Sequence, residues 1–365
     1  MLVLLMNSIA WDTRVKKIVK ELDDLGKNPI VISVEQEGTH LKIVGNAKLK
    51  PVFFTGGRYF FPGVSRILLF YLFLREAARQ CTQEQVIWCN DLNTLLTGCI
   101  LKLIFKLHLI YDTHEYAVDE IIGASKAVIL LKKYYQRFLI RFADKVVSVS
   151  PLIAKQLQID NPFLKDVVVL KNLPDIDLKK RLPINLKEKY SIPSKNTVIV
   201  YHGSISNDYV VNELLKAFKF MEWPNVSFLV LGMGSRLCEL RRRSSSMHHV
   251  NINDALPIDQ LHGVLVSCDF GLVVYPPGCL NHEFCFPNKY FDYLANGVIP
   301  LIPDLQQMKE HIRETGFGCL MRDLQSYDDL IEAKSSMKML FEKSNIQEES
   351  LWASHSQIIE ERVIR

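Results

Sequence analysis

Residues 280–302 read LNHEFCFPNKYFDYLANGVIPLI, and this stretch concentrates more polar, ligand-type side chains than any other part of the chain. The pattern predicts a loop, a helix and a buried strand, because Pro287 suits the first turn of a helix and Gly297 the position just beyond its end. Asn288, Lys289 and Asp292 then share one helix face. A cation, an amide and a carboxylate at the start of a helix suit a ligand with both phosphate and hydroxyl groups. A surface helix with an ordinary i, i+3 ion pair explains the same residues equally well.

Length and composition indicate a globular protein of two domains. The chain has 365 residues, of which 48% are hydrophobic and 23% charged, which is typical of a folded protein. The net charge of +4 is too small to indicate a nucleic-acid partner. The eight cysteines form no CxxC pair, which favours reduced thiols in a cytoplasmic protein over disulfides or a zinc site. The opening MLVLLM reads as a buried strand rather than an export signal, and no segment reaches the roughly 18 apolar residues of a membrane span.

Strands and helices alternate from the first residues onward. Residues 2–6 predict a strand, 14–25 a helix and 30–33 a second strand, which is the start of a parallel sheet with ligands beyond the carboxyl ends of its strands. Further strands are predicted at 86–89, 109–113, 145–149, 167–170, 198–201, 228–231, 250–252, 270–274 and 298–302. We therefore predict an α/β protein with an N-terminal domain at 1–173, a proline-containing linker at 174–196 and a C-terminal domain at 197–345. Residues 346–365 form a closing helix, for which a return to the first domain is one option, and the cleft between the domains is the default site.

Polar residues follow several of the predicted strands. Asp12 follows the first strand, where helix capping is a simpler interpretation than ligand contact. His114 and Glu115 follow the strand at 109–113, and an unperturbed His titrates near neutral pH. A catalytic role for His114 competes with a structural role in a turn. Gly203 and Gly234 follow strands of the second domain and would let backbone N–H groups approach a phosphate, although so short a pattern is weak evidence.

Two stretches, 58–79 and 126–141, interleave aromatic, aliphatic and basic residues. On helices, this composition suits docking to an anionic membrane face. Two core helices with solvated basic edges would give the same pattern. The membrane interpretation therefore depends on the function.

The whole chain resembles the GT-B glycosyltransferases, specifically the retaining glycosyltransferase family 4. The resemblance rests on NHEFCFPNKYFDYLANGVIPLI at 281–302, DTHE at 112–115, ADKVVSVS at 143–150 and CDFGLVVYPP at 268–277. It implies two Rossmann-like domains that face each other across a cleft. It also implies transfer of a sugar from a nucleotide-diphosphate-sugar donor to a saccharide or lipid-linked saccharide acceptor, with retention and without a metal or other cofactor. Relatives of this kind commonly act in bacterial surface polysaccharide or glycolipid synthesis, in the cytoplasm or on the inner face of the membrane.

The resemblance also implies roles for individual residues. Asp292 stands in the place of the acid that binds the donor ribose, where the family usually has Glu. Asn288 and Lys289 stand beside the donor, and Lys289 is expected to be catalytic. The other donor residues are Gly203, Ser204 and Gly234, and the acceptor-side residues are Asp12, Glu115 and the catalytic candidate His114.

Two departures from the family pattern keep a second hypothesis open. The first of the family's two acids falls on Phe284, with Glu283 adjacent. The cations that usually face the leaving diphosphate are replaced by Ser204 and Tyr209. Loss of such a charge typically costs on the order of 3 kcal/mol of transition-state stabilisation. Either Lys289 and backbone amides substitute for those cations, or the protein is a weak or inactive relative that serves as a scaffold in a glycan-assembly complex.

Overall fold

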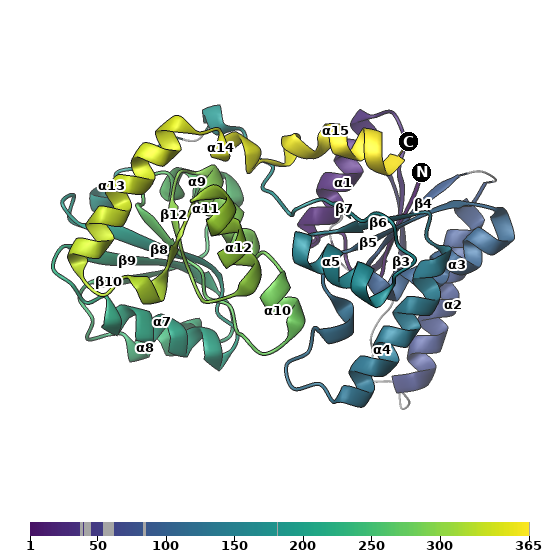
Figure 1. The fold of residues 1–365 in the computed structure, drawn as a ribbon, viewed down its shortest axis with the longest axis horizontal. Coiled ribbons are helices and arrows are strands. Elements are labelled where there is room, and N and C mark those ends of the chain that lie inside the picture. The colour runs from purple at the N-terminus through teal and green to yellow at the C-terminus, as the bar shows by residue number, and fades with distance from the viewer. Residues whose placement is uncertain (37–38, 40–44, 54–61, 83–84, 181, 365) are drawn as a thin grey trace. The chain divides into compact units, whose positions relative to one another are not determined.

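The computed structural model describes residues 1–36, 39, 45–53, 62–82, 85–180 and 182–364. Arg58 and its neighbours up to residue 61, which begin the first basic-aromatic stretch, lie outside the described residues. The chain forms two compact units (Figure 1). Unit 1 comprises Met1–Lys171, Cys279–Asn281 and His355–Arg365, and unit 2 comprises Asn172–Gly278 and His282–Ser354.

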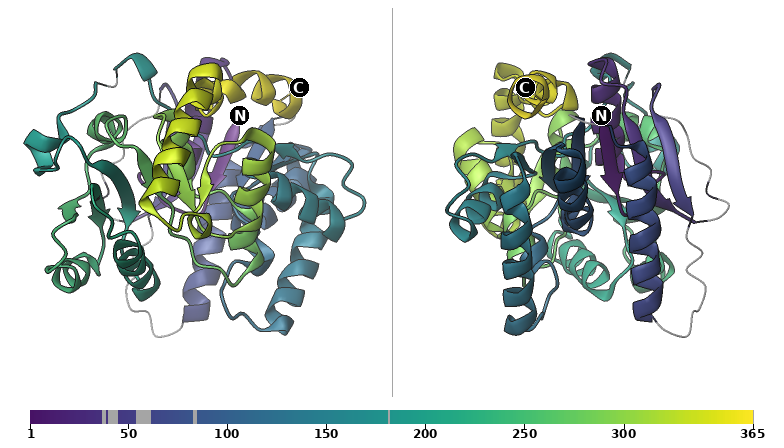
Figure 2. Two further views of the ribbon diagram at one scale, coloured as in Figure 1. Left: turned by 60° about the vertical axis from the view of Figure 1, so that its left-hand side comes forward. Right: turned by 90° about the vertical axis from the view of Figure 1, so that its right-hand side faces the viewer.

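Unit 1 is built on a seven-stranded parallel sheet in the order β3-β2-β1-β4-β5-β6-β7. Helices α2, α3 and α4 lie together on one side of this sheet and α1 lies on the other (Figures 1 and 2). The strands are β1 (Leu2–Leu5), β2 (Ile30–Glu35), β3 (Lys48–Phe53), β4 (Val86–Asn90), β5 (His108–Thr113), β6 (Lys145–Ser148) and β7 (Val168–Val169). The helices are α1 (Thr13–Asp24), α2 (Pro62–Gln80), α3 (Asp91–Phe105), η1 (Ala117–Asp119), α4 (Lys126–Leu139), η2 (Ile140–Phe142) and α5 (Pro151–Asp160).

Unit 2 is built on a six-stranded parallel sheet in the order β10-β9-β8-β11-β12-β13. The strands are β8 (Thr197–Ser204), β9 (Val226–Met233), β10 (Val250–Asp254), β11 (Phe270–Leu272), β12 (Ile299–Ile302) and β13 (Cys319–Leu320). The helices are η3 (Leu178–Lys180), α6 (Leu186–Tyr190), α7 (Asp208–Phe220), α8 (Leu237–Arg243), α9 (Ile258–Leu265), α11 (Asn288–Ala295), α12 (Gln306–Thr315), η4 (Met321–Asp323), α13 (Tyr327–Lys343) and α14 (Ile346–Glu349). Two helices contain residues of both units: α10 (Leu280–Phe284) begins in unit 1, and η5 (Trp352–His355) ends there.

Both sheets place their first strand beside the fourth, so each contains the reversal of strand order at which Rossmann-like folds bind ligands. The central strands are buried on both faces, as β8 and β9 show, because helices cover both sides of a parallel sheet. The predicted α/β class with two Rossmann-like units is confirmed.

Every predicted strand is present, and two further strands were missed. β3 is an edge strand in which only one residue is buried, and β13 has two residues, so neither gives a clear apolar run. β8 continues to Ser204, so His202 and Gly203, which we predicted in a loop, lie on the strand. The predicted linker contains α6, whose Leu186 and Tyr190 belong to the core of unit 2.

The end of the chain is not the single helix predicted at 346–365. It consists of α14, η5, α15 (Ser356–Ile358) and η6 (Ile359–Ile364), and the part from His355 onward belongs to unit 1. Ile359 and Val363 are fully buried there. Among the described residues, none of the helices combines the length and the apolar character that crossing a bilayer requires.

Candidate functional site

In unit 2, the carboxyl end of β8 meets the first turn of α11. Gly203 has a φ of +123°, which side-chain-bearing residues rarely adopt. A Cβ atom added to Gly203 would lie 3.5 Å from Lys289 Nζ, so this ammonium stands directly beside the bare backbone of the glycine. The same ammonium lies 4.0 Å from the centroid of the Tyr201 ring, in cation–π contact. The structure thus brings together two predicted donor residues that are far apart in the sequence.

Burial makes positive charge costly in this corner of unit 2. It lowers the pKa of Lys289 to about 7, and the nearby carboxylate of Asp292 partly opposes this shift. It also lowers the pKa of His202 to about 3, and the charges of Lys289 and His262 add to this shift. At neutral pH the corner therefore holds a neutral imidazole, a partly charged amine and a carboxylate.

His202 is a site residue that the sequence analysis missed. It is 9% exposed, and its Nε2 atom lies 3.6 Å from Asp292 Oδ2. Within the described part of the chain, that nitrogen has no hydrogen-bond partner. A buried polar atom without a partner is costly, so His202 is poised to accept or donate a further bond. Its place directly before Gly203 at the end of a strand was the signal that could have identified it.

Helix α11 presents its polar face as the spacing predicts. Its buried residues are Tyr290, Phe291, Tyr293, Leu294 and Ala295. Pro287 is the N-cap residue, one position earlier than predicted, and provides no side-chain cap. Asn288 is exposed and its Oδ1 accepts a hydrogen bond of 2.8 Å from Asn172 Nδ2, while the side chain of Asp292 is only 15% exposed. Lys289 and Asp292 are therefore the two α11 residues held in the buried corner.

The loops that follow β8 and β9 are fastened to each other. Ile205 N donates to Met233 O over 2.7 Å, and Arg236 N donates to Ile205 O over 3.0 Å. A Cβ atom on Gly234 would lie 2.6 Å from Ile205 O, so only glycine allows this approach. Ser204, the last residue of β8, and Gly234, which directly follows β9, consequently lie close together at the carboxyl edge of the sheet. The close packing against Ile205 is therefore sufficient to explain glycine at position 234, with or without a role in ligand binding.

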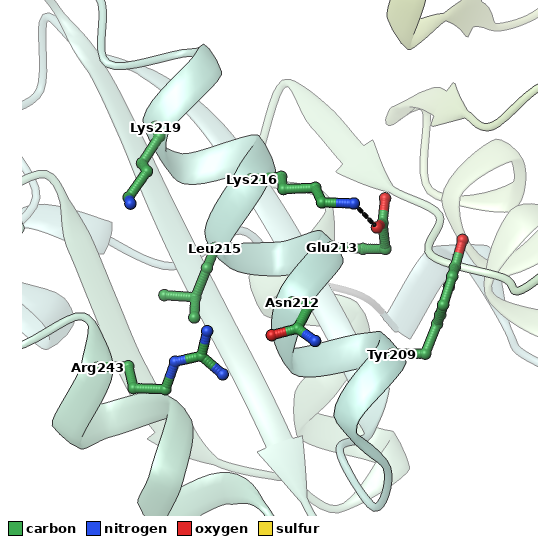
Figure 3. Close-up of a pocket in the computed structure, with 7 residues that line it drawn as sticks. All are labelled: Tyr209, Asn212, Glu213, Leu215, Lys216, Lys219 and Arg243. Carbon is green, nitrogen blue, oxygen red and sulfur yellow. Dashed lines mark hydrogen bonds and ion pairs between the residues drawn. The ribbon is translucent and has the colours of Figure 1, made fainter.

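The start of α7 carries no cation in the place where the family pattern expects one. Tyr209 lies there, and its hydroxyl donates a long bond of 3.4 Å to Tyr275 O. Arg236 reaches this helix start, but its guanidinium pairs with Asp208 at 3.1 Å. Figure 3 shows the surface hollow along α7 and α8, whose lining residues are Tyr209, Asn212, Glu213, Leu215, Lys216, Lys219 and Arg243. Lys216 in this hollow is neutralised by Glu213 at 2.6 Å.

In unit 1, His114 is held at the carboxyl ends of the neighbouring strands β4 and β5. Its backbone N donates to Asp91 Oδ1 over 3.0 Å, and its Nδ1 lies 3.3 Å from Asp91 Oδ2. Its Nε2 lies 3.2 Å from Asn90 Oδ1. Asp91 adopts a φ of +63°, a costly conformation for a residue with a side chain. Burial raises the pKa of Asp91, and His114 opposes this shift. The imidazole is therefore fixed in orientation with 14% of its side chain exposed.

The remaining acids of unit 1 have different environments. Asp112 is fully buried and accepts from Arg14 Nη2 at 2.8 Å and from Trp88 Nε1 at 3.3 Å, so it supports the fold. Glu115 is exposed and accepts from Asn281 Nδ2 at 3.3 Å. Asp12 caps α1 by accepting from Val15 N over 2.9 Å. In the part of the chain that the structure describes, no group of three His, Cys, Asp or Glu side chains is arranged to hold a metal.

No protein-family model matches the chain, and no curated protein sequence matches it significantly. Solved structures do match its fold over nearly the whole length. HepE from Anabaena, in complex with UDP and glucose, has 14% identity and a TM-score of 0.68, over 100% of this chain and 99% of that chain. Sucrose-phosphate synthase from Thermosynechococcus elongatus has 13% identity and a TM-score of 0.74, over 98% and 97%. A trehalose-6-phosphate protein from E. coli bound with UDP-2-fluoro glucose has 13% identity and a TM-score of 0.64, over 99% of both chains. The chain therefore has a GT-B-like fold.

Proposed function

We propose that this protein is a glycosyltransferase that uses a nucleotide-diphosphate sugar as its donor. The observation that carries the proposal is the ammonium of Lys289 beside the bare backbone of Gly203, with Asp292 on the next turn of α11. This corner lies at the carboxyl end of β8, next to the reversal of strand order in unit 2, where Rossmann-like sheets bind nucleotides. HepE is described in complex with UDP-glucose, which supports the same class of donor here.

The proposed donor site uses the groups of this corner for different parts of the ligand. Asp292 accepts hydrogen bonds from the ribose hydroxyls, and Asn288 lies at the rim of the site. Lys289 and the backbone at Gly203, Ser204 and Gly234 face the diphosphate. A diphosphate beside Lys289 favours the charged amine, so donor binding restores the positive charge that burial disfavours.

We propose transfer with retention, as the resemblance to glycosyltransferase family 4 implies, and without a required metal. The bond between the anomeric carbon and the diphosphate oxygen breaks while the acceptor hydroxyl adds to the same face of the sugar. The proton of that hydroxyl leaves with the diphosphate, whose charge Lys289 offsets. His114, Asp12 and Glu115 of unit 1 are the proposed acceptor-side residues, and His114 is catalytic. The acceptor is a saccharide or lipid-linked saccharide of surface polysaccharide or glycolipid synthesis in the cytoplasm.

Thermal shift with a panel of UDP-, GDP-, ADP- and CMP-sugars tests the donor proposal. One nucleotide class should raise the melting temperature, because a ligand at 100 times its Kd stabilises by about 2.7 kcal/mol. Lys289→Ala and Asp292→Ala should each reduce the shift strongly, because both weaken binding of the nucleotide sugar. Lys216→Ala, which removes an ammonium that is 73% exposed, should leave it unchanged. If no nucleotide sugar stabilises the wild-type protein, the proposal fails.

A scaffold is the second candidate, and it is favoured by Tyr209 in the place of a cation and by Arg236 in an ion pair with Asp208. A scaffold would bind a nucleotide sugar without turnover. The two candidates differ in the release of nucleoside diphosphate from the bound donor. Release that depends on Lys289 supports the enzyme, and prolonged binding without release supports the scaffold.

We also propose that unit 1 docks on an anionic membrane surface through α2 and α4. The apolar residues exposed on these helices are Ile67, Leu68, Tyr71, Val128, Leu130, Leu131, Tyr134, Tyr135 and Phe138. The two helices contain seven cationic residues and one acidic residue, whereas the whole chain has 44 and 40. Apolar side chains flanked by cations match the boundary between lipid headgroups and acyl chains.

The structure changes one part of this interpretation. Lys132 and Lys133 of the second basic-aromatic stretch are turned toward the protein, where they pair with Glu120 at 2.7 Å and Asp160 at 2.5 Å. The outward face of α4 is therefore apolar rather than mixed with these cations. Hydrophobic insertion should supply most of the binding, with Arg66, Arg75 and Lys126 adding the preference for anionic lipid.

Vesicle flotation with phosphatidylcholine alone and with added phosphatidylglycerol tests the surface. We expect recovery with both vesicles and higher recovery with the anionic ones. Leu131→Asp should abolish recovery, and Met339→Asp, which alters an exposed apolar residue of unit 2, should not. Equal recovery in both vesicles would remove the electrostatic argument, and unchanged recovery of Leu131→Asp would remove the surface.

A further inference from the structure

Trp11 lies in the loop between β1 and α1 and is 79% exposed. This is the largest exposed fraction among the large apolar side chains that the structure describes. An exposed indole leaves a large aromatic face in water. A single exposed apolar residue is common on protein surfaces and by itself indicates no function. The backbone that carries Trp11, however, is held in place by several hydrogen bonds.

The loop of Trp11 is fixed by a buried carboxylate. Glu35, at the end of β2, is 1% exposed and accepts from Ser8 Oγ at 2.5 Å, from Ile9 N at 3.0 Å and from Ser33 Oγ at 2.7 Å. Burial of an ionised carboxylate is costly unless hydrogen bonds satisfy it, and here two of the three bonds go to the loop.

Further bonds fix the residues on either side of the indole. Trp11 N donates to Ser8 O over 3.2 Å, which closes a turn. Lys16 Nζ donates to Ala10 O over 2.7 Å, and Ile9 is buried at 1% exposure. The indole is thus displayed to solvent on a backbone that is held in place, which is the arrangement of a preformed binding surface rather than of a loose loop.

Groups that bind hydroxyls lie at the same edge of the sheet. β1 and β4 are neighbours, and Asn90 Nδ2 donates to Leu4 O over 2.9 Å, which fixes the end of β4 against β1. Asp91, whose side chain is 35% exposed, and His114 follow at that edge. Asp12 is near enough for its charge to raise the pKa of Asp91. An exposed indole and partly exposed carboxylate and imidazole groups at one edge of the sheet match a sugar ring, which has an apolar C–H face and a rim of hydroxyls.

We infer that Trp11 is a stacking platform for a saccharide ring of the acceptor, with Asp91 and His114 directed to its hydroxyls. The inference rests on the proposed function and names the part of the acceptor that unit 1 recognises. It makes Trp11 a specificity residue.

Saturation-transfer NMR on the full chain, with maltose, cellobiose, lactose and chitobiose as probes, tests the inference. We expect at least one of these disaccharides to bind the wild-type protein at millimolar concentration. Trp11→Ala should weaken that binding about tenfold, which corresponds to about 1.4 kcal/mol. Trp11→Phe, which keeps an aromatic face, should stay within about threefold. Leu182→Ala is the matched control, because Leu182 is an equally exposed apolar residue, at 75%, in unit 2.

Nucleotide-sugar thermal shift on the same variants separates this inference from the proposed function. Trp11→Ala should keep the wild-type shift, because the donor residues lie in unit 2. Unchanged disaccharide binding by Trp11→Ala, or no binding of any probe by the wild-type protein, would overturn the stacking role. A Trp11-dependent disaccharide signal without any nucleotide-sugar shift would retain the saccharide site and overturn the donor proposal.

Discussion

Lys289 lies in the proposed phosphate-binding position, and burial lowers the pKa of its amine. Its pKa of about 7 means that half of the empty sites carry the charge at neutral pH. A bound diphosphate raises that pKa, so binding takes up a proton, and affinity must fall as pH rises above 7. We expect the Kd of the nucleotide sugar to be roughly tenfold higher at pH 8.5 than at pH 7. Calorimetry in buffers of different ionisation enthalpy measures both the affinity and the proton uptake.

Lys289→Met is the control for this pH dependence. The variant should bind weakly with no dependence on pH in this range, because its side chain cannot titrate. Lys216→Ala should keep the wild-type slope. A wild-type affinity that is constant from pH 6.5 to 8.5 would mean that Lys289 does not face the diphosphate.

Asp292 yields a second prediction, which concerns the ribose. A hydrogen bond to a charged group contributes about 1.5–3 kcal/mol, so UDP should bind on the order of 10- to 100-fold more tightly than 2′,3′-dideoxy-UDP. Asp292→Ala should remove this preference and weaken only the binding of UDP. For a protein that prefers another base, the matching nucleotide pair applies. Titration calorimetry of both ligands completes a double-mutant cycle, and a preference retained by the variant would place the ribose elsewhere.

At the scale of elements, the fastened loops after β8 and β9 allow a matched pair of glycine substitutions. Gly234→Ala would place a Cβ 2.6 Å from Ile205 O, so the loop after β8 must move. Gly26→Ala is the control, since Gly26 also has a positive φ, of +69°, but nothing lies within 4 Å of an added Cβ. Gly26→Ala should lose about 1 kcal/mol from backbone strain, and Gly234→Ala should lose more because its Cβ also clashes. Only Gly234→Ala should also weaken nucleotide-sugar binding, and equal binding by both variants would separate these loops from the donor site.

The sequence predicts a strand correctly where an apolar run is long and is bounded by turn residues. β9 and β12 are examples, since β12 is buried throughout, β9 is buried at all but its last residue, and both are flanked by turn residues. β3 was not predicted, because it lies at the edge of the sheet and carries charged residues in place of an apolar run. The end of β8 was misassigned because His202 reads as a loop residue, whereas pairing with β9 extends the strand to Ser204.

In the candidate site, too, local sequence pattern predicts only part of the arrangement. The spacing on α11 correctly gives the polar face of Asn288, Lys289 and Asp292. It cannot give the approach of Lys289 to Gly203, which depends on how α11 packs beside β8. Nor could composition show that Lys132 and Lys133 turn inward, because their partners come from elsewhere in the chain. The spacing of residues in the sequence predicts which side chains share a helix face. Tertiary packing decides which of these side chains contact residues from other elements.

At the scale of the whole molecule, the chain builds unit 1 from both of its ends. The segment from His355 to the last residue belongs to the unit formed by the first 171 residues. His355 anchors it, with Nε2 3.2 Å from Lys171 O and only 6% of the residue exposed. The completeness of unit 1 therefore depends on a contact between residues that are distant in sequence.

This anchor should be sensitive to acid. Burial, with the charges of Arg14, Lys171 and Lys17, lowers the pKa of His355 to about 4, against about 6.5 in the unfolded segment. The folded segment therefore excludes a proton that the unfolded one takes up. Its stability is complete above pH 6.5 and is lost as pH falls toward 4, by about 2 kcal/mol at pH 5. Hydrogen exchange of residues 355–364, corrected for the intrinsic rate, should show about 20-fold less protection at pH 5 than at pH 7. His355→Asn, which cannot titrate, should show equal protection at both pH values, and a wild-type segment with unchanged protection would refute this role of His355.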